Sequence, residues 1–318
     1  MQSLALEFLK VTESAAISAF PWIGRGNKIA ADDAATTAMR DALNQVPMEG
    51  TIVIGEGEID EAPMLFIGEK LGRDEIIEVD IAVDPIEGTT PTANGQENAI
   101  TVIAAAPKGT LLHAPDMYME KMAVGPKAKG KINVEAPLID NLKMVAEANG
   151  KDISELNVAV QDRPRHAEYI DTIRKSGAKV QLFKDGDVLY AAATCMEHID
   201  IDMFLGVGGA PEGVLSAVAI RALGGELQAR LKPRDDGETD RCKKMGIANP
   251  EGALTLNHLV CSDEGIFVAT GLTDSFLLNG IKCNNGEYKT HSILIDGKEN
   301  QLRFIESQYN AKPAPQTI

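Results

Sequence analysis

Several features that mark other classes of protein are missing from this sequence of 318 residues. No apolar run approaches the ~20 residues that a membrane-spanning helix needs. The first twenty residues contain no basic segment, and Glu7, Lys10 and Glu13 interrupt any apolar one. We therefore expect an ordinary helix at the N-terminus rather than a signal peptide, and no membrane partner.

Cysteine and histidine are too few and too scattered for common structural frameworks. Cys195, Cys242, Cys261 and Cys283 form no C-x-x-C pair, which argues against a disulfide framework and against a zinc ribbon. We expect free, mostly buried thiols, as in a cytoplasmic protein of a reducing compartment. The five histidines form no H-x-x-x-H pair, so a zinc site is disfavoured.

Basic residues are also scarce. Lys and Arg number 31 against 47 Asp and Glu, which gives a formal net charge of -16. This balance argues against nucleic acid as a partner, because a phosphate backbone requires a basic patch. A phosphorylated small molecule remains possible, because bound divalent cations can reverse the local sign of charge. Solubility alone would explain most of the carboxylates.

The hydrophobic pattern predicts alternating helices and strands. We expect helices at 3–19, 32–46, 136–150 and 165–177, and strands at 51–54, 78–84, 98–107, 156–162, 179–187, 265–271, 288–296 and 301–306. The segment 202–226 is typical of a strand, a glycine-rich turn and a helix. The polar stretch 232–244 predicts an exposed loop or flap, and the Asn-Gly pair within 283–288 predicts a hairpin turn.

The same alternation suggests two halves. A boundary near 130–155 would divide the chain into an N-terminal half, 1–150, and a C-terminal half, 151–318. Because both halves alternate helix and strand, we expect layered α/β packing with a cleft between them.

One predicted strand ends in an unusual group of polar residues. "EVDIAVD" runs into Asp84 and Pro85, and Glu87, Gly88 and Thr89 follow at once. Proline cannot donate to a strand ladder, and glycine lets the backbone approach a ligand closely. Open α/β sheets bind ligands at the carboxyl ends of their strands, so these residues are candidates for a binding site.

Further carboxylates occupy comparable positions. They are Asp32 and Asp33 in "AADD", Glu56, Glu58, Asp60 and Glu61 in "GEGEIDE", and Glu212 in "GGAPEG". Taken singly, each could be a helix cap, a solvated turn or a complement to a helix dipole. Neighbouring strand ends lie roughly 5 Å apart, where several carboxylates repel unless a cation holds them. Oxygen-only ligands suit Mg²⁺ or Mn²⁺, and paired ions of this kind can clamp a phosphoryl transfer.

Candidate contacts for a phosphorylated sugar lie mainly in the second half. Arg163 and Arg165 flank Pro164 and could contact a phosphate bidentately, or form a solvated basic turn. The turn "KDGD" offers Asp185 and Asp187 to sugar hydroxyls, although it could also be an ordinary turn.

Two glycine-rich stretches could receive an anion. Lys28 is a flexible cation in the glycine-rich stretch "GRGNK". The alternative is that this stretch is an ordinary surface loop. "GVGGAPEG" follows a predicted strand and opens a helix, so its backbone amides could face an anion. It is not a dinucleotide fingerprint, because Pro211 stands where the third glycine should be.

Together these motifs resemble a known family of phosphatases. "DPIEGT" resembles the D-P-I-D-G-T signature of the lithium-sensitive, metal-dependent sugar and inositol phosphatases, with "GEGE" in place of their G-E-E. Nearly the whole chain is similar to the class II fructose-1,6-bisphosphatases of bacteria, most clearly in "VIGEGEIDEAPM", "VDIAVDPIEGT", "HAPDMYMEK", "GGAPEGV" and "CKKMGI". The resemblance implies an α/β fold, a layered α-β-α-β-α sandwich of the sugar-phosphatase type. It also implies Mn²⁺- or Mg²⁺-dependent hydrolysis of the 1-phosphate of fructose 1,6-bisphosphate in gluconeogenesis.

The resemblance also implies roles for individual residues. The metal ligands would be Asp32, Glu56, Asp84, Glu87 and Glu212. The substrate contacts would be Lys28, Glu87, Gly88, Thr89, Tyr118, Arg163, Pro164, Arg165, Asp185, Gly186, Asp187 and Gly209. Water would be the nucleophile, and the catalytic residues would be Thr89, Glu56 and Asp84. We also expect a homo-oligomer, either a dimer or a tetramer.

Two departures and several alternatives accompany this interpretation. The family often has Arg-Met after the threonine and Asp before the lysine, where this chain has Thr90-Pro91 and Asn27. The substrate could be sedoheptulose 1,7-bisphosphate or an inositol phosphate, or the chain could be a non-catalytic sugar-phosphate sensor. Thr89 could instead cap a helix or act as a covalent nucleophile. A haloacid-dehalogenase-type phosphatase is disfavoured, because Ile86 stands where its second acid is needed.

Overall fold

The computed structural model describes residues 1–56, 64–73 and 77–310. The helices are α1 Ala5–Ala19, α2 Lys28–Leu43, α3 Thr89–Asn94, α4 Leu138–Asn149, α5 Ala167–Ser176, α6 Asp187–Ala193, α7 Ala210–Ala222, α8 Asp236–Lys244 and α9 Leu256–Leu259. The strands are β1 Glu49–Ile54, β2 Lys70–Leu71, β3 Glu78–Glu87, β4 Ile100–Pro107, β5 Tyr118–Val124, β6 Asn157–Gln161, β7 Lys179–Phe183, β8 Met203–Gly209, β9 Glu226–Leu231, β10 Ile266–Gly271, β11 Lys282–Asn284, β12 Glu287–Asp296 and β13 Gln301–Asn310.

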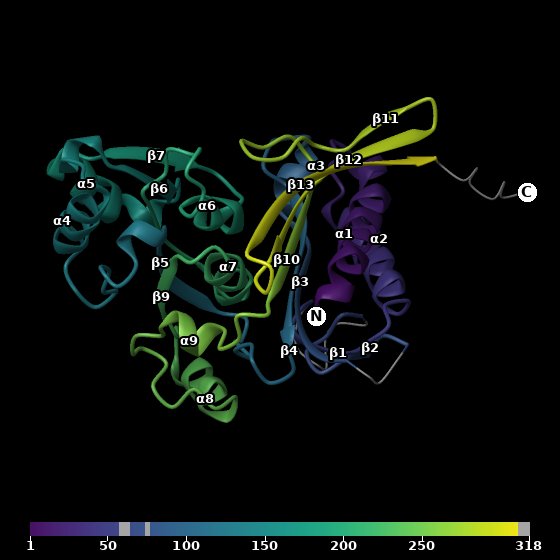
Figure 1. Cartoon of the computed structure of the whole chain (residues 1–318), viewed down its shortest axis with the longest axis horizontal. Coiled ribbons are helices and arrows are strands. Elements are labelled where there is room, and N and C mark those ends of the chain that lie inside the picture. The colour runs from purple at the N-terminus through teal and green to yellow at the C-terminus, as the bar shows by residue number, and fades with distance from the viewer. Residues whose placement is uncertain (57–63, 74–76, 311–318) are drawn as a thin grey trace, which may run out of the picture.

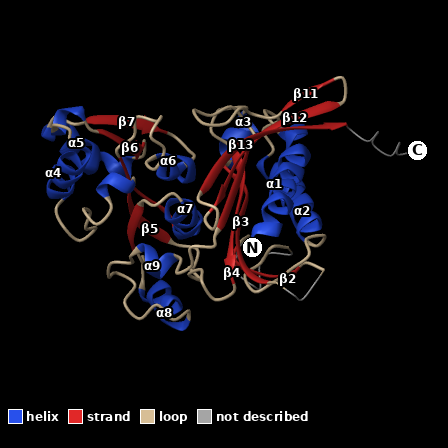
Figure 2. Ribbon diagram, in the orientation of Figure 1, coloured by secondary structure: helices blue, strands red, loops and turns tan. Residues whose placement is uncertain are grey.

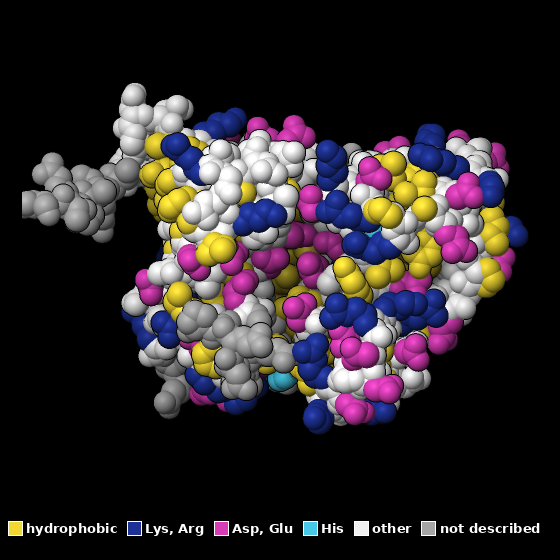
Figure 3. Space-filling model, turned by 180° about the vertical axis from the view of Figure 1, so that it is seen from behind, with side chains coloured by type: hydrophobic (Ala, Val, Ile, Leu, Met, Phe, Trp, Pro, Cys, Tyr) yellow, Lys and Arg dark blue, Asp and Glu magenta, His cyan; other side chains and the backbone are white. Residues whose placement is uncertain are grey.

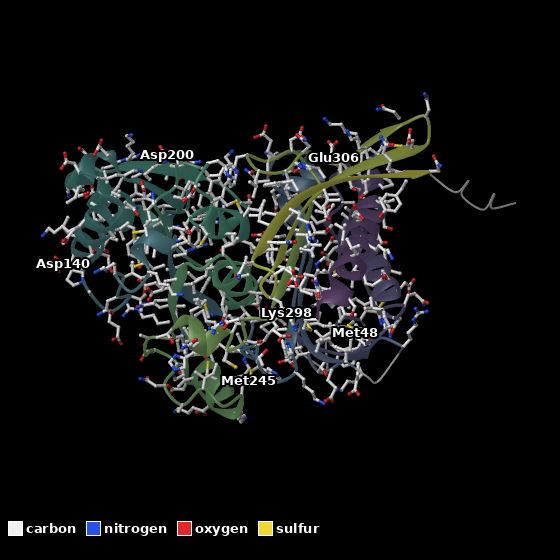
Figure 4. All side chains as sticks on the ribbon, viewed as in Figure 1. Met48, Asp140, Asp200, Met245, Lys298 and Glu306 are labelled. Carbon is white, nitrogen blue, oxygen red and sulfur yellow. The ribbon has the colours of Figure 1, made fainter. Side chains whose placement is uncertain are left out.

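The elements form alternating layers of helix and sheet (Figures 1 and 2). Helices α1 and α2 cover the outer face of an eight-stranded sheet, and α6 and α7 lie between it and a five-stranded sheet. Helices α4 and α5 cover the outer face of the smaller sheet. Figure 4 labels Asp140 in α4, at one end of this stack, and Met48, which precedes β1 and is buried in the core of the larger sheet. The predicted α-β-α-β-α sandwich is confirmed.

The two sheets draw on different parts of the chain. The larger sheet has the order β11-β12-β10-β4-β3-β1-β2, with β13 paired to β12, and therefore takes strands from both ends of the sequence. The smaller sheet, β7-β6-β8-β5-β9, comes entirely from the middle of the chain. The two sheets do not follow the boundary at residue 150, and the division into two domains, 1–150 and 151–318, stays a prediction.

Each interface between layers has its own apolar core. Phe8 of α1, Met39 of α2 and Ile81 of β3 belong to the buried cluster between the outer helices and the larger sheet. A second cluster surrounds α7 between the sheets, and a third joins the smaller sheet to α4 and α5. Full burial of one such side chain contributes about 1.5–3 kcal/mol to the stability of the layered fold.

Helix α2 begins earlier than the sequence pattern predicts. Its first residue is Lys28, and the side chain of Asn27 caps it by accepting a hydrogen bond from the amide of Ala30. The alternative in which Asp32 or Asp33 caps this helix is therefore wrong, because both lie inside it.

Two other local predictions are corrected. The stretch 232–244 is not simply a loop, because α8 occupies most of it and the Asp235 side chain accepts from the amide of Glu238. The four cysteines are free as expected, but only Cys242 is buried.

The hairpin at 283–288 is confirmed, with Asn285 and Gly286 at positive φ between β11 and β12.

Across the described ranges 1–56, 64–73 and 77–310, no helix is long and apolar enough to cross a membrane.

Candidate active site

The carboxylates of the two early strands meet at one edge of the larger sheet. Strands β1 and β3 are parallel neighbours, with Ile54 paired to Ala82, so their carboxyl ends lie side by side. Glu56 follows β1 by two residues, and Asp84 and Glu87 occupy the end of β3. The carboxylate argument depends on these two strands being neighbours in one sheet, and that condition is met.

Strand β3 does not end at Asp84 as the sequence pattern predicts. It runs through Pro85 to Glu87, but its pairing with β4 shifts register between Asp84 and Glu87. The amide of Ile86 turns back to donate to Asp84 Oδ1 at 3.0 Å. Proline thus interrupts the ladder without ending the strand.

Gly88 makes the sharp turn that follows. Its φ of 96° lies in the left-handed region, and a Cβ at this position would stand 3.3 Å from Ala99 Cα and from Asn98 O. Gly88 is the N-cap of α3 and Thr89 its first residue, so Thr89 is not the helix cap. This turn leaves Thr89 at the carboxylate edge of the sheet.

Two more carboxylates approach from other elements. Asp32 lies on α2 and Glu212 in the first turn of α7. Burial raises the pKa of Asp84 well above its usual range, and the negative charges of Glu56, Glu212 and Asp32 raise it further. The structure therefore brings together residues from four separate segments that the sequence suggested as metal ligands.

Glu87 is a buried carboxylate of this cluster. It is 5% exposed, and its Oε1 accepts from the amide of Val188 at 3.1 Å. Its Oε2 is a buried oxygen without a hydrogen-bond partner. Burial and the neighbouring Asp187 and Asp84 raise the pKa of Glu87 well above its usual range.

These features make the cluster suitable for a cation. Within the residues that the structure describes, no group of three or more carboxylate, imidazole or thiol side chains converges closely enough to hold a metal ion as it stands. The donor set is nonetheless all oxygen, and Glu87 leaves one buried carboxylate oxygen unpartnered. Carboxylates in such a position suit a hard divalent cation, and a bound cation would offset their repulsion.

The opposite wall of the site comes from the middle of the chain. Asp187 is the first residue of α6, after the turn at Gly186, and Gly209 ends β8. Lys121 of β5 donates to Asp187 Oδ2 at 2.5 Å and to Gly209 O at 3.0 Å. Sequence reasoning placed Asp187 at the sugar hydroxyls but did not anticipate its pairing with a buried lysine.

The two candidate phosphate-binding arginines lie on this same wall. Arg163 donates to Asp185 Oδ1 at 2.9 Å. Arg165 lies over the ring of Tyr118, with its guanidinium carbon 5.3 Å from the ring centroid, and donates to Val207 O at 2.7 Å. Pro164 begins the short 3-10 turn between them. Arginine side chains fixed in this way are well suited to a phosphate.

Lys28 lies on the same side of the site as the carboxylates, at the first residue of α2. Its Nζ donates to Thr90 Oγ1 at 2.7 Å, and both residues are exposed. Thr90 stands where the family often has arginine, so the departure seen in the sequence provides a fixed position for Lys28 beside Thr89.

Two residues that sequence reasoning passed over belong to the neighbourhood. The charge of Asp116 contributes to the raised pKa values of Glu56 and Glu212. Asp116 and Lys121 both lie in "HAPDMYMEK", the motif from which only Tyr118 was selected. Glu58, Asp60 and Glu61, also proposed as carboxylates of the cluster, lie outside the described residues.

One face of the molecule is hollowed near its centre (Figure 3). Asp and Glu side chains gather in the hollow, and Lys and Arg side chains lie along its rim. An acidic floor with a basic rim is the arrangement expected for a cation-assisted site that receives an anionic ligand.

Comparison with known families decides between the phosphatase classes. The model for the bacterial, glpX-encoded fructose-1,6-bisphosphatases matches residues 2–309. The chain belongs to this family. The match covers both walls of the site, so Asp32 near the start and Glu212 in the middle fall within one homologous unit.

Individual relatives are similar over almost their full length. The chain is 50% identical to fructose-1,6-bisphosphatase 1 class 2 of Escherichia coli strain K12, over 96% of this chain and 95% of the relative. It is 49% identical to fructose-1,6-bisphosphatase class 2 of Haemophilus influenzae, over 96% of both chains. Both relatives carry the same enzyme description.

Proposed function

We propose that the carboxylate edge between α2, β1, β3 and α7 is where this chain carries out its family's reaction. The chain is a fructose-1,6-bisphosphatase of gluconeogenesis, and it hydrolyses fructose 1,6-bisphosphate to fructose 6-phosphate and phosphate. The observation that supports this placement is the convergence of Glu56, Asp84 and Glu212 beside the buried, unpartnered oxygen of Glu87.

The residues that would hold Mn²⁺ or Mg²⁺ are all carboxylates of this cluster. They are Asp32, Glu56, Asp84, Glu87 and Glu212. A divalent cation bound there supplies charge neutralisation at the phosphate and lowers the pKa of water. In the metal-free chain, burial and the repulsion between neighbouring carboxylates raise the pKa values of Asp84 and Glu87, and no bound charge offsets that repulsion.

Thr89 is the side chain best placed to handle the proton of the attacking water. It stands at the tip of the turn two residues beyond Glu87. Its hydroxyl can accept a hydrogen bond from the water and pass a proton towards a carboxylate, so that Glu56 or Asp84 receives it. In the metal-free chain, burial and the charges of Asp32 and Asp116 raise the pKa of Glu56 to about 7, and a bound cation would favour its ionised form, the form that can accept a proton.

The other wall would hold the sugar and its distal phosphate. Arg163 and Arg165 are fixed by hydrogen bonds and by the Tyr118 ring, so each presents a preorganised cation. Asp185, Gly186, Asp187 and Gly209 would contact the sugar, with Lys28, Gly88 and Thr89 at the scissile phosphate.

A phosphate-release assay on a panel of sugar phosphates, with and without Mn²⁺, tests this proposal. We expect cation-dependent release from fructose 1,6-bisphosphate, abolished in D84A and E87A variants that keep their fold. Full turnover in D84A would place the chemistry elsewhere. Preference for sedoheptulose 1,7-bisphosphate or an inositol phosphate would change the substrate, and release from none would favour the sensor.

A cytoplasmic location and a dimeric or tetrameric assembly complete the proposal. Fractionation of cells that produce the chain tests the first. Size-exclusion chromatography with light scattering tests the second, and a monomer at micromolar concentration would contradict it.

A further inference from the structure

Lys121 is a charged side chain in an unusual position. It lies at the centre of β5 and is 1% exposed, whereas lysines are almost never fully buried unless paired. Its amine donates to the Asp187 carboxylate and to the Gly209 carbonyl, at 2.5 and 3.0 Å. These two acceptors come from different elements, α6 and β8, so the lysine joins three segments at one point.

Two glycines, Gly208 and Gly213, lie close to the Lys121 side chain. A Cβ at Gly208 would stand 2.9 Å from Asp187 Oδ2 and 3.1 Å from Lys121 Nζ. A Cβ at Gly213 would stand 3.3 Å from Lys121 Cδ and 2.5 Å from Met119 Sδ. Neither glycine has a positive φ, so crowding explains why both positions are small: the ion pair leaves no room beside Gly208, and at Gly213 the nearest atom is Met119 Sδ.

Stability alone is a weak reason for such a pair. The desolvation of two buried charges commonly offsets their attraction, and apolar residues of similar volume stabilise a fold equally well. An ion pair differs from an apolar pair because its hydrogen bonds are directional. The amine therefore fixes the position of each acceptor oxygen.

We propose that Lys121 is a positioning residue for substrate binding, which holds the Asp187 carboxylate and the Gly209 carbonyl at the places from which they meet the sugar bisphosphate. This inference rests on the proposed location of the site. Lys121 itself is buried behind that wall and acts through its two acceptors.

The first test replaces Lys121 with methionine, which keeps the length of the side chain and removes its charge. We expect K121M to raise KM for fructose 1,6-bisphosphate about tenfold and to change kcat much less, as for a lost contact that is similar in ground and transition states. The matched control is K151M. Lys151 is ion-paired to Asp202, 2.8 Å away, but Asp202 precedes β8 at the end of that strand opposite to Gly209.

We expect K151M to leave both kinetic constants at the parental values, whatever it does to thermal stability. If K121M kept the parental KM while melting at a lower temperature, Lys121 would be a stabilising residue only and the proposal would be wrong.

A second test avoids the unpaired buried carboxylate that could keep K121M from folding. G208A leaves both charges in place but puts a methyl group against the ion pair, so it should also raise KM. G206A is its control on the same face of β8, because a Cβ there meets His166 at an ordinary 3.6 Å. A G208A enzyme with parental KM would overturn the proposal even if K121M could not be purified.

The failure of this inference can be told apart from failure of the proposed site. If D84A remained active, the site itself would be misplaced. If D84A were inactive and both K121M and G208A bound substrate normally, the site would stand and only the role of Lys121 would fall.

Discussion

Removing one negative charge from the carboxylate cluster should stabilise the metal-free protein. Burial and the charges of Asp32 and Asp116 raise the pKa of Glu56 from 4.5 to about 7. A carboxyl group whose pKa is higher in the folded than in the unfolded state favours folding below the unfolded pKa. That advantage is lost as the pH rises through the folded pKa. The variant E56Q, which is neutral at every pH, should therefore be more stable than the parent at pH 8, and the difference should fade towards pH 4.5.

The size of this effect follows from the pKa itself. A rise from 4.5 to about 7 corresponds to at most about 3 kcal/mol of unfolding free energy above pH 7. Because the Glu56 side chain is partly exposed, solvent screens some of this interaction, and we expect about 1–2 kcal/mol. The same variant should lose its phosphatase activity, because Glu56 is a proposed ligand.

Urea denaturation in EDTA between pH 5 and pH 8.5 measures the difference, with E251Q, at an exposed carboxylate, as the control. Addition of Mn²⁺ should reverse the order of stability, since a ligand at 100 times its Kd stabilises the parent by about 2.7 kcal/mol. An E56Q protein less stable than the parent in EDTA at pH 8, or stabilised equally at pH 5, would refute the reasoning.

Substitutions at three further positions address the two walls of the site. T89S should retain a reduced rate and T89A should lose ~10²-fold or more in kcat, the usual scale for a positioned proton transfer, with little change in melting temperature; a T89A enzyme as fast as the parent, or a trapped phosphothreonine, would contradict the proposed role. R165A should mainly raise KM, because its contact is remote from the reacting phosphorus; unchanged KM with a collapsed kcat would argue for another role. T90V removes the acceptor that fixes Lys28 and should raise KM severalfold while T90S does not, and equal kinetics for the two would show that the contact has no effect on binding.

The layered architecture could be predicted because apolar periodicity and family resemblance agree along most of the chain. Strands β5 and β9 were not predicted, because charged residues interrupt them. Glu120 and Lys121 lie inside β5, and both are buried through partners that sequence alone does not reveal. Helix α8 was not predicted for a similar reason: its sequence is almost entirely polar and gives little apolar periodicity. Asp235 caps the start of this helix.

The candidate site was predictable in its residue types and only partly in its connections. Carboxylates beside glycine at strand ends marked Asp84 and Glu87 without any structure. Asn27 caps α2, and Asp32 therefore lies inside the helix. The sequence could not decide this, because Asn27, Asp32 and Asp33 are all residue types that cap helices. The pairing of Lys121 with Asp187 joins residues 66 positions apart, a separation that hydrophobic patterns do not encode.

The course of the larger sheet through the chain has a consequence for synthesis on the ribosome. Strands β3 and β4 emerge early, but β10, the other neighbour of β4, follows only after the entire smaller sheet has been made. The apolar edge of β4 must therefore wait for a partner more than a hundred residues downstream, and long-range pairing of this kind is slow and exposed to aggregation. The middle segment can close its own sheet in the meantime, so Glu212 and the arginine wall would be ready before the sheet that carries Asp84 is complete. A nascent chain released before β10 would then hold four of its five proposed metal-binding carboxylates on an unfinished surface, and chaperone binding should concentrate on that intermediate.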